Sequence, residues 1–270
     1  MEIPPAFLEI FPPDSQGLLR FLGPEGEMDD LLLSKIVHPV NQVQEDLQSE
    51  GDSVRVFNAY MGHPVQLAFQ RFLTLRSEVG PPGRTPYKET ADFSWIYGDQ
   101  CVVVGELKRH GIINPNRWSG RLQPDGNRVW LSKELRGYCH RYRTPAVAAF
   151  DGRWLLILIF QANREEGLQD ERCPVTSIIF DYKSPLLRHC LFRLVCQQTR
   201  RCQAETAPSL NLDGYTRRFV WWSGQPYWVD ANNHIYRQHP NRHARRLDPM
   251  NGAWYWHTPN GRVWDTAGLW

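Results

Sequence analysis

The chain has 270 residues, of which 41% are hydrophobic and 22% are charged, and its formal net charge is +2. This length and composition are typical of a globular protein with one domain of about 200 residues and an appendage. No apolar run approaches the ~20 residues of a membrane span, and the chain does not open with the basic and apolar segments of a secretory signal. None of the six cysteines forms a CxxC pair. We therefore expect a reduced, intracellular protein, cytoplasmic or nuclear, that is not secreted and has no membrane partner.

Charge is distributed unevenly along the chain. Residues 1–52 contain two basic and eleven acidic residues, a net charge of −9, whereas the remaining residues contain 29 basic and 18 acidic ones, a net charge of +11. A basic body suits a polyanionic partner such as nucleic acid. The same excess is equally compatible with an ordinary solvated surface, because it is spread over more than two hundred residues.

The first part of the chain predicts an arm and two helices. Residues 1–27 are rich in proline and glycine and are typical of an irregular arm. Residues 29–48 and 64–78 place apolar side chains at near-helical spacing, which predicts a helix in each segment. We expect an acidic arm and helix over residues 1–52, followed by a core over residues 53–205.

The rest of the core alternates between strands and helices. Residues 91–97 and 101–107 predict a β-hairpin around the turn that begins at Gly98. Residues 144–150 and 153–161 predict a second hairpin, whose continuous apolar character indicates strands that are buried on both faces. Further elements are predicted as a polar loop at 111–127, a helix at 131–142, a strand at 173–180 and a basic amphipathic helix at 185–203.

The last part of the chain differs in composition. Seven of the eleven tryptophans fall in its final 56 residues. Residues 227–237 and 255–265 form a weak repeat in which an aromatic pair, a polar turn and a returning aromatic residue follow one another. This pattern predicts a small Trp-rich β-hairpin appendage over residues 206–270. Its aromatic side chains suit the core of such a module, the bases of a single strand or a protein partner.

The residues with the clearest chemistry are Asp92, Glu106 and Lys108. The first hairpin brings Asp92 beside Glu106, and the two-residue period of a strand places Glu106 and Lys108 on one face. Two carboxylates and the backbone carbonyl of Leu107 are hard oxygen ligands that suit Mg²⁺ or Mn²⁺. The lysine could orient or deprotonate an attacking water and offset charge on a phosphate. The alternative is an exposed aspartate beside an ion pair on an edge strand.

These residues resemble the signature of the PD-(D/E)XK nuclease superfamily. Asp92 follows Ala91 where the family has Pro-Asp, and the segment Glu106, Leu107, Lys108 matches the ExK element. The similarity extends over about residues 64–161 and is closest to uncharacterised nuclease-like proteins of filamentous fungi.

The resemblance implies a fold and an activity. The fold would be α/β, with a restriction-endonuclease-like mixed central sheet flanked by helices. The activity would be a divalent-metal-dependent phosphodiesterase acting on DNA or RNA, with Mg²⁺ or Mn²⁺ held by Asp92, Glu106 and the carbonyl of Leu107. Many members also carry a Gln and a Tyr one turn apart on the next helix, where Glu134 and Tyr138 stand here. The alternative function is a catalytically inactive relative that binds protein or nucleic acid.

Other residues could complete such a site. The first helix of the family often adds an acidic residue, for which Glu78 and Glu45 are the candidates, and His63 could act as a metal ligand. Each is also compatible with an ordinary surface position. Arginines that could hold phosphates, or simply form solvated helix faces, are Arg71, Arg109, Arg136, Arg141 and Arg143, together with Arg188, Arg193, Arg200 and Arg201 on the last helix.

Overall fold

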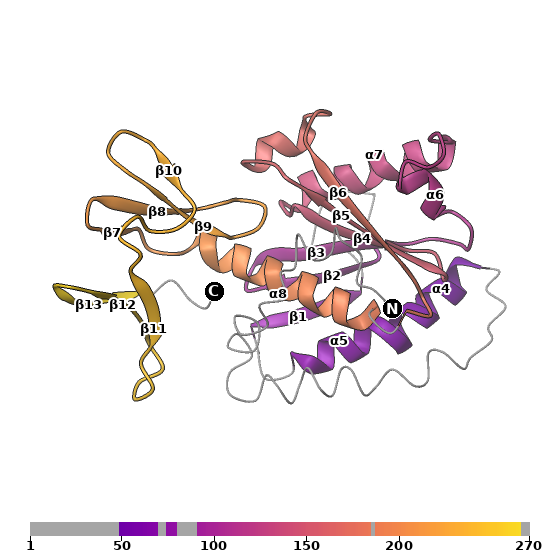
Figure 1. Cartoon of the computed structure of the whole chain (residues 1–270). Coiled ribbons are helices and arrows are strands. Elements are labelled where there is room, and N and C mark those ends of the chain that lie inside the picture. Colours follow the sequence, from indigo (N-terminus) through magenta and orange to yellow (C-terminus); the bar gives the residue numbers. More distant parts are fainter. Residues whose placement is uncertain (1–48, 70–73, 80–90, 185–186, 266–270) are drawn as a thin grey trace.

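The computed structural model describes residues 49–69, 74–79, 91–184 and 187–265. The predicted helix over 29–48 and the candidates Glu45 and Arg71 lie outside these residues. The described chain forms an α/β core followed by a β-rich C-terminal module (Figure 1). Within the described part, no helix is long and apolar enough to cross a membrane.

The core is built on a six-stranded mixed sheet whose spatial order equals its sequence order. β3 and β4 run parallel, and every other neighbouring pair is antiparallel. The parallel pair requires a crossover, which contains helix α7. The strands are β1 (Leu75–Val79), β2 (Phe93–Tyr97), β3 (Gln100–Leu107), β4 (Ala146–Phe150), β5 (Trp154–Phe160) and β6 (Val175–Asp181). Both predicted hairpins and the α/β class are confirmed.

Helices cover both faces of this sheet. On one face, α7 packs its buried residues Leu131, Leu135 and Cys139 against Val104 and Val147 of the sheet. The other face is covered by α4, α5 and α8 (Figure 1). The helices are α4 (Glu50–Phe57), the π-helix η1 (Asn58–Gly62), α5 (His63–Ala68), α6 (Pro115–Trp118), α7 (Gly126–Arg141), the 3₁₀-helix η2 (Glu165–Gln169) and α8 (Leu187–Glu205).

The predicted helix over residues 64–78 is wrong in its second half. Helical structure ends at Ala68, and residues 75–79 instead form the strand β1, which pairs with β2 along its whole length. The sequence of β1 has an apolar residue at each end and three polar residues between them, so its local pattern indicates a strand no better than a helix. Backbone pairing to β2 and burial of Leu75 in the core decide between the two patterns. Glu78 therefore lies in a strand, not at the end of a helix.

α7 begins earlier than its apolar pattern indicates. Its cap is Asp125, whose side chain accepts a hydrogen bond of 2.9 Å from the backbone N–H of Arg128. This is the normal role of aspartate before a helix. The extra turn brings Trp130 onto the helix, and the short helix α6 occupies part of the predicted loop over 111–127.

The last helix of the core, α8, is buried on almost every side. Arg188, Arg193 and Arg201 are all buried, so the expectation that they form a solvated or phosphate-binding stripe is wrong. Arg188 donates to the carbonyl of Tyr60 at 2.5 Å, and Arg201 donates to the carbonyl of Cys101 at 3.1 Å. These arginines join α8 to neighbouring segments instead of facing a ligand.

The C-terminal module contains more strands than the repeat predicts. Both predicted hairpins are present, as β9 with β10 and as β12 with β13. The strands are β7 (Leu210–Leu212), β8 (Tyr215–Phe219), β9 (Pro226–Val229), β10 (Ile235–Tyr236), β11 (Ala244–Leu247), β12 (Trp254–Thr258) and β13 (Gly261–Asp265), arranged in a four-stranded and a three-stranded sheet. Trp228 and Trp256 meet edge to face at 5.3 Å between these sheets. Buried aromatic side chains therefore form part of the module's interior.

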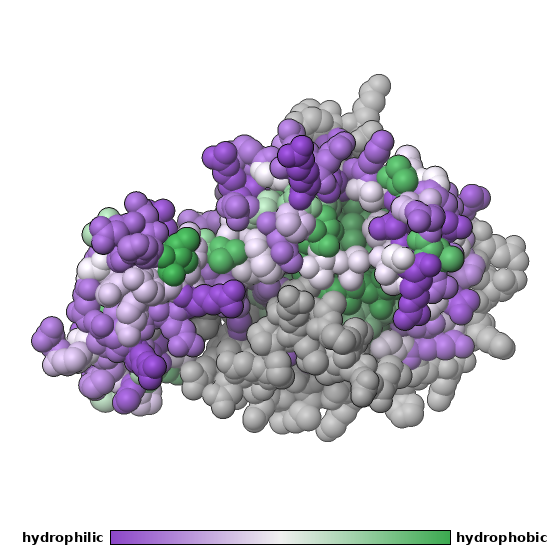
Figure 2. All heavy atoms as spheres, turned by 45° about the horizontal axis from the view of Figure 1, so that its top comes forward, coloured by the Kyte–Doolittle hydropathy of each residue, from purple (hydrophilic) through white to green (hydrophobic). Residues whose placement is uncertain are grey.

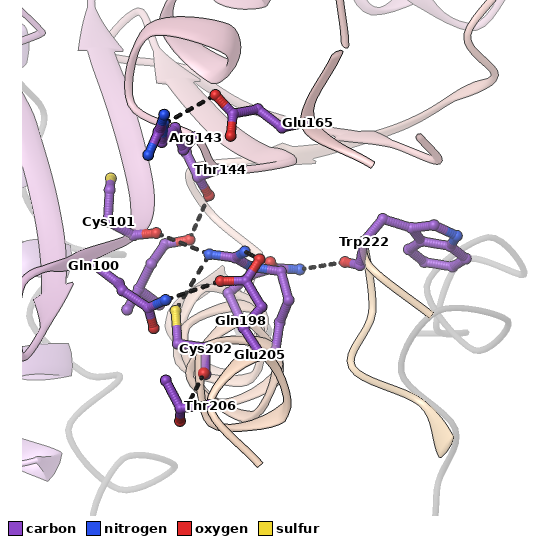
Figure 3. A network of polar contacts seen from close by, with 12 residues as sticks. Gln100, Cys101, Arg143, Thr144, Glu165, Gln198, Cys202, Glu205, Thr206 and Trp222 are labelled. Atoms are coloured by element: carbon purple, nitrogen blue, oxygen red, sulfur yellow. Dashed lines mark hydrogen bonds and ion pairs between the residues drawn. The ribbon is translucent and has the colours of Figure 1, made fainter. Parts of the chain in front are cut away.

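The module is attached to the end of α8. The side chain of Gln198 on α8 donates to the carbonyl of Trp222 at 3.2 Å (Figure 3). The end of α8 is in turn joined to β3 of the core, where Gln100 donates to Glu205 at 2.9 Å (Figure 3). Gly224, at φ +68°, lies so close to α8 that a Cβ there would stand 2.8 Å from the Cα of Arg201. Only glycine allows that approach. On the face seen in Figure 2 the module's surface is mostly hydrophilic, whereas apolar surface is visible on the core.

Candidate functional site

Asp92 directly precedes β2, and Glu106 lies near the end of β3, at the same end of this antiparallel pair. The ladder pairs Phe93 with Gly105, and the N–H of Asp92 donates to the carbonyl of Gly105 at 2.9 Å. The carboxylate of Asp92 is held by β3, because its Oδ2 accepts the N–H of Leu107 at 2.6 Å. The hairpin thus brings together the two carboxylates that the sequence placed at its open end.

The packing of Phe93 fixes the position of Glu106. A Cβ on Gly105 would lie 1.8 Å from the ring of Phe93, so the ring occupies the space that a side chain would need. Phe93 is itself stacked on Phe57 of α4, with ring centroids 4.2 Å apart. The next residue, Glu106, points to the opposite face of the sheet, where α7 lies, and it is buried there.

Lys108 lies at the centre of a cluster of polar side chains. Its Nζ donates to Oε1 of Glu106 at 2.5 Å and to Oε1 of Glu134 at 3.2 Å. Tyr138 donates to the same oxygen of Glu134 at 3.3 Å, and Nζ lies 4.8 Å from the ring centroid of Trp130. The three α7 residues are spaced four apart, so they form one stripe along the helix. β3 is an interior strand and this ion pair is largely buried, unlike the edge-strand alternative.

Burial, with a smaller effect from neighbouring carboxylates, raises the pKa values of the acids in the cluster. Burial is the main cause that raises the pKa of Glu106 to about 7, with the charges of Asp92 and Glu134 adding to it and the hydrogen bond from Lys108 opposing it. Burial also raises the pKa of Asp92 against the effect of its hydrogen bond from Leu107. Glu106 can therefore exchange a proton near neutral pH.

Lys108 and Tyr138 respond to the same surroundings. Burial tends to lower the pKa of Lys108, but its hydrogen bonds and ion pairs with Glu106 and Glu134 outweigh this and raise it. Burial and the two carboxylates raise the pKa of Tyr138. As long as Glu106 and Glu134 remain beside it, Lys108 stays protonated and acts as a cation and hydrogen-bond donor.

Two oxygens of the cluster test whether a metal ion would fit. Oε2 of Glu106 and Oε2 of Glu134 are both buried and have no hydrogen-bond partner in the structure. A buried carboxylate oxygen without a partner costs free energy that a cation would recover. Within the described residues, no group of three or more His, Cys, Asp or Glu side chains is gathered closely enough to hold a metal ion. The two carboxylate oxygens without partners are those that could accept a cation, and Mg²⁺ is commonly bound through only one or two carboxylates with several waters.

The other predicted site residues lie elsewhere. Glu78 is bound by Arg76 at 2.9 Å on β1, and His63 is exposed at the start of α5. Arg143, in a left-handed conformation at φ 54°, pairs with Glu165 at 2.9 Å, and Arg136 donates to backbone carbonyls near η2. Of the predicted arginines, Arg109 is the one adjacent to Lys108 in the chain, and it is exposed.

Sequence reasoning missed two contributors to this cluster. Glu50, in the first turn of α4, is an acidic residue whose charge helps to raise the pKa of Asp92. The capping pattern formed by Ser49 and Asp52 could have indicated a helix start at this point. Trp130, which contacts Lys108, was missed because the apolar pattern of α7 begins only at Leu131.

The loop after Lys108 is fixed by the second hairpin. The buried carboxylate of Asp151 accepts the N–H groups of Gly111 and Ile113 at 3.1 and 2.9 Å, and those of Arg153 and Trp154 at its own turn. One aspartate thus joins the β4–β5 turn to the segment that follows the candidate site.

Comparisons with protein-family models, with curated proteins and with solved structures find no match to this chain.

Proposed function

We propose that this protein is a divalent-metal-dependent phosphodiesterase that cleaves DNA or RNA. The observation that supports this most is the pairing of Asp92 with Glu106 on adjacent strands, with Lys108 held between Glu106 and Glu134. Mg²⁺ or Mn²⁺ would be held by Asp92, Glu106 and the carbonyl oxygen of Leu107. We also propose that the six-stranded sheet and its flanking helices form a restriction-endonuclease-like fold.

Each residue has a defined part in this proposal. A bound divalent cation would supply Lewis acidity toward a water and a phosphate oxygen. Asp92 is held in place by the N–H of Leu107, so its other oxygen can face a ligand without a cost in reorientation. Lys108 donates hydrogen bonds to a phosphate oxygen or positions the attacking water, and Tyr138 fixes Glu134 beside it. Glu106 must be deprotonated to hold the cation, so its pKa of about 7 means that binding would be favoured above neutral pH.

The test is cleavage of single- and double-stranded DNA and RNA by the full chain with Mg²⁺ or Mn²⁺. We expect Asp92→Asn, Glu106→Gln and Lys108→Met each to lower the rate at least about a hundredfold, as for the loss of a group that acts in the transition state. Lys133→Met is the matched control, because Lys133 is an exposed lysine on α7, the helix that carries Glu134 and Tyr138. Cleavage that all three site variants retain would rule out this centre.

A second function is favoured by one observation. Lys108 is already engaged by two carboxylates, and the described residues provide no three-ligand group for a metal. These features suit an inactive relative that binds nucleic acid or protein. Calorimetry with Mn²⁺ separates the two functions: no heat of binding and no cleavage, together with retained oligonucleotide binding, would favour the binding module.

A further inference from the structure

A second pocket lies on the opposite flank of α7 from the acidic cluster. The cluster uses Trp130, Glu134 and Tyr138, whereas this pocket is lined by Arg128, Ser132 and Arg136, which form the next stripe of residues four apart. Two positions along a helix rotate a side chain by about 200°. The cavity has a volume of about 190 Å³ and is closed by Trp118 of α6 and by residues of β5 and β6, including Phe160 and Ser177.

The charged side chains of this pocket are all cationic. Arg128 lies over the ring of Trp118, with its guanidinium carbon 5.5 Å from the centroid, and Arg136 lies over Phe160 at 4.8 Å. Neither arginine has a carboxylate partner among the described residues. Asp125, which precedes the helix, is occupied by Arg117 at 2.9 Å and by the cap of α7.

The arginines are fixed in place before any ligand arrives. Nη1 of Arg136 donates to the carbonyl oxygens of Leu168 and Asp170, at 3.1 and 2.6 Å, which uses one nitrogen and leaves Nε and Nη2 without a partner among the described residues. Aromatic rings support both guanidinium groups from one side. A fixed guanidinium loses little conformational entropy when it binds an anion.

Trp118 also lines the pocket, so its indole ring can report on what binds there. Trp118 is only 7% exposed, and its indole Nε1–H is buried without any hydrogen-bond partner. Buried tryptophan N–H groups normally have an acceptor. The hydroxyl groups of Ser132 and Ser177 each donate to a backbone carbonyl at 3.4 Å, and neither accepts from this N–H. The charge of the pocket therefore comes from the two guanidinium groups of Arg128 and Arg136.

We propose that this pocket binds a phosphate group. Two guanidinium groups match the charge of about −2 on a phosphate monoester, and its oxygens can accept hydrogen bonds from both arginines. The cavity is smaller than the ~300–1,000 Å³ of sites for drug-sized molecules, so it holds the phosphate and not the whole of a large ligand. The phosphate comes either from the end of a nucleic acid strand or from a small molecule.

The first measurement follows the indole N–H signals of the ¹⁵N-labelled full chain during titration with inorganic phosphate. Trp118→Phe identifies the signal of Trp118 by its disappearance. We expect that signal to shift saturably, and Arg128→Gln to weaken binding at least about tenfold, as for the loss of a charge-assisted hydrogen bond. Arg164→Gln, at an exposed arginine paired with Glu166, is the matched control and should bind like the parent.

The second measurement compares a short oligonucleotide that carries a 5′-phosphate with the same oligonucleotide that ends in a 5′-hydroxyl. Tighter binding of the phosphorylated form that depends on Arg128 would identify a strand end as the source. Saturable binding of inorganic phosphate alone would identify a small phosphate. A Trp118 signal that does not move with either ligand, or that moves equally in Arg128→Gln, would overturn the proposal.

This site can be separated from the proposed nuclease centre. Asp92→Asn should abolish cleavage and leave the response of Trp118 to phosphate unchanged, because the two sites lie on different flanks of α7. If the parent cleaves nucleic acid but its Trp118 signal does not respond to phosphate, the phosphate pocket is ruled out and the nuclease proposal stands. If the parent does not cleave nucleic acid but its Trp118 signal responds to phosphate, the nuclease proposal is ruled out and the phosphate pocket stands.

Discussion

Two buried clusters of charge, one in the core and one in the C-terminal module, have opposite imbalances. In the module, Arg217 and Arg245 both meet one oxygen of Asp265, at 2.5 and 2.9 Å, and Trp256 donates to the same oxygen. In the core, several carboxylates surround one lysine. In the ion pairs of the described residues, the module's cluster sets two arginines against one carboxylate, and the core cluster sets one lysine against two carboxylates.

The difference concerns what each cluster can do. Burial lowers the pKa of Arg245 to about 10, which still leaves it charged at neutral pH, so the module's cluster is a permanent ionic link between two sheets. The core cluster instead contains Glu106, with a pKa raised to about 7, and two carboxylate oxygens without partners. It can respond to a proton or a cation, whereas the module's cluster cannot.

The largest expected effect comes from breaking the module's cluster. Asp265→Asn removes the buried carboxylate that Arg217 and Arg245 both meet and should lower the free energy of unfolding of the module by about 3–5 kcal/mol. Chemical denaturation followed by tryptophan fluorescence measures this. Asp99→Asn, at an exposed turn in the core, is the control and should cost little. A loss below about 1 kcal/mol for Asp265→Asn would show that the cluster is not a structural link.

An intermediate effect is expected where packing supports the core cluster. Gly105→Ala places a Cβ 1.8 Å from the ring of Phe93, which Phe57 prevents from retreating, so unfolding should become easier by about 3 kcal/mol. Gly137→Ala on α7 is a matched control, because no atom lies within 4 Å of its added Cβ. That change should stabilise the helix by about 0.5–1 kcal/mol. Equal melting temperatures for the two variants would contradict this account of the site.

The smallest effect distinguishes the two clusters by pH. The folded pKa of Glu106 lies above its unfolded value, so the folded state holds the proton more tightly, and stability is lost as pH rises from about 4.5 to about 7. Glu106→Gln removes this dependence, so the stability of the parent relative to the variant should fall by about 1–2 kcal/mol across that window. Denaturation at pH 5 and pH 8 measures it. A parent that gains stability relative to the variant on going to pH 8 would reverse the sign and contradict the raised pKa.

The proposed metal connects with this pH effect. At pH 8 the parent carries the unfavourable charge on Glu106, so Mn²⁺ should raise its melting temperature if the cation binds there. Glu106→Gln should not respond. This comparison needs no catalytic activity, and it also applies to an inactive protein that still holds a metal.

Local sequence determined much of the fold and the chemistry of the candidate site. The turns at Gly98 and Gly152 and the apolar strands beside them depend on neighbours in the chain, so both hairpins were predictable. The hairpin in turn brings Asp92 to Glu106, because antiparallel pairing follows from a tight turn. The spacing of Glu134 and Tyr138 placed them on one helix stripe. The aromatic repeat likewise predicted the hairpins of the module.

Tertiary structure decided what depends on segments far apart. Whether residues 75–79 form a helix or a strand was settled by β2, and whether the arginines of α8 face solvent was settled by the elements that surround that helix. Glu50, Trp118 and Trp130 gain their importance only from the surfaces that they meet. A sequence pattern specifies local geometry and the side of an element that is apolar. Burial, partner charges and cavities arise from the packing of elements that no local pattern specifies.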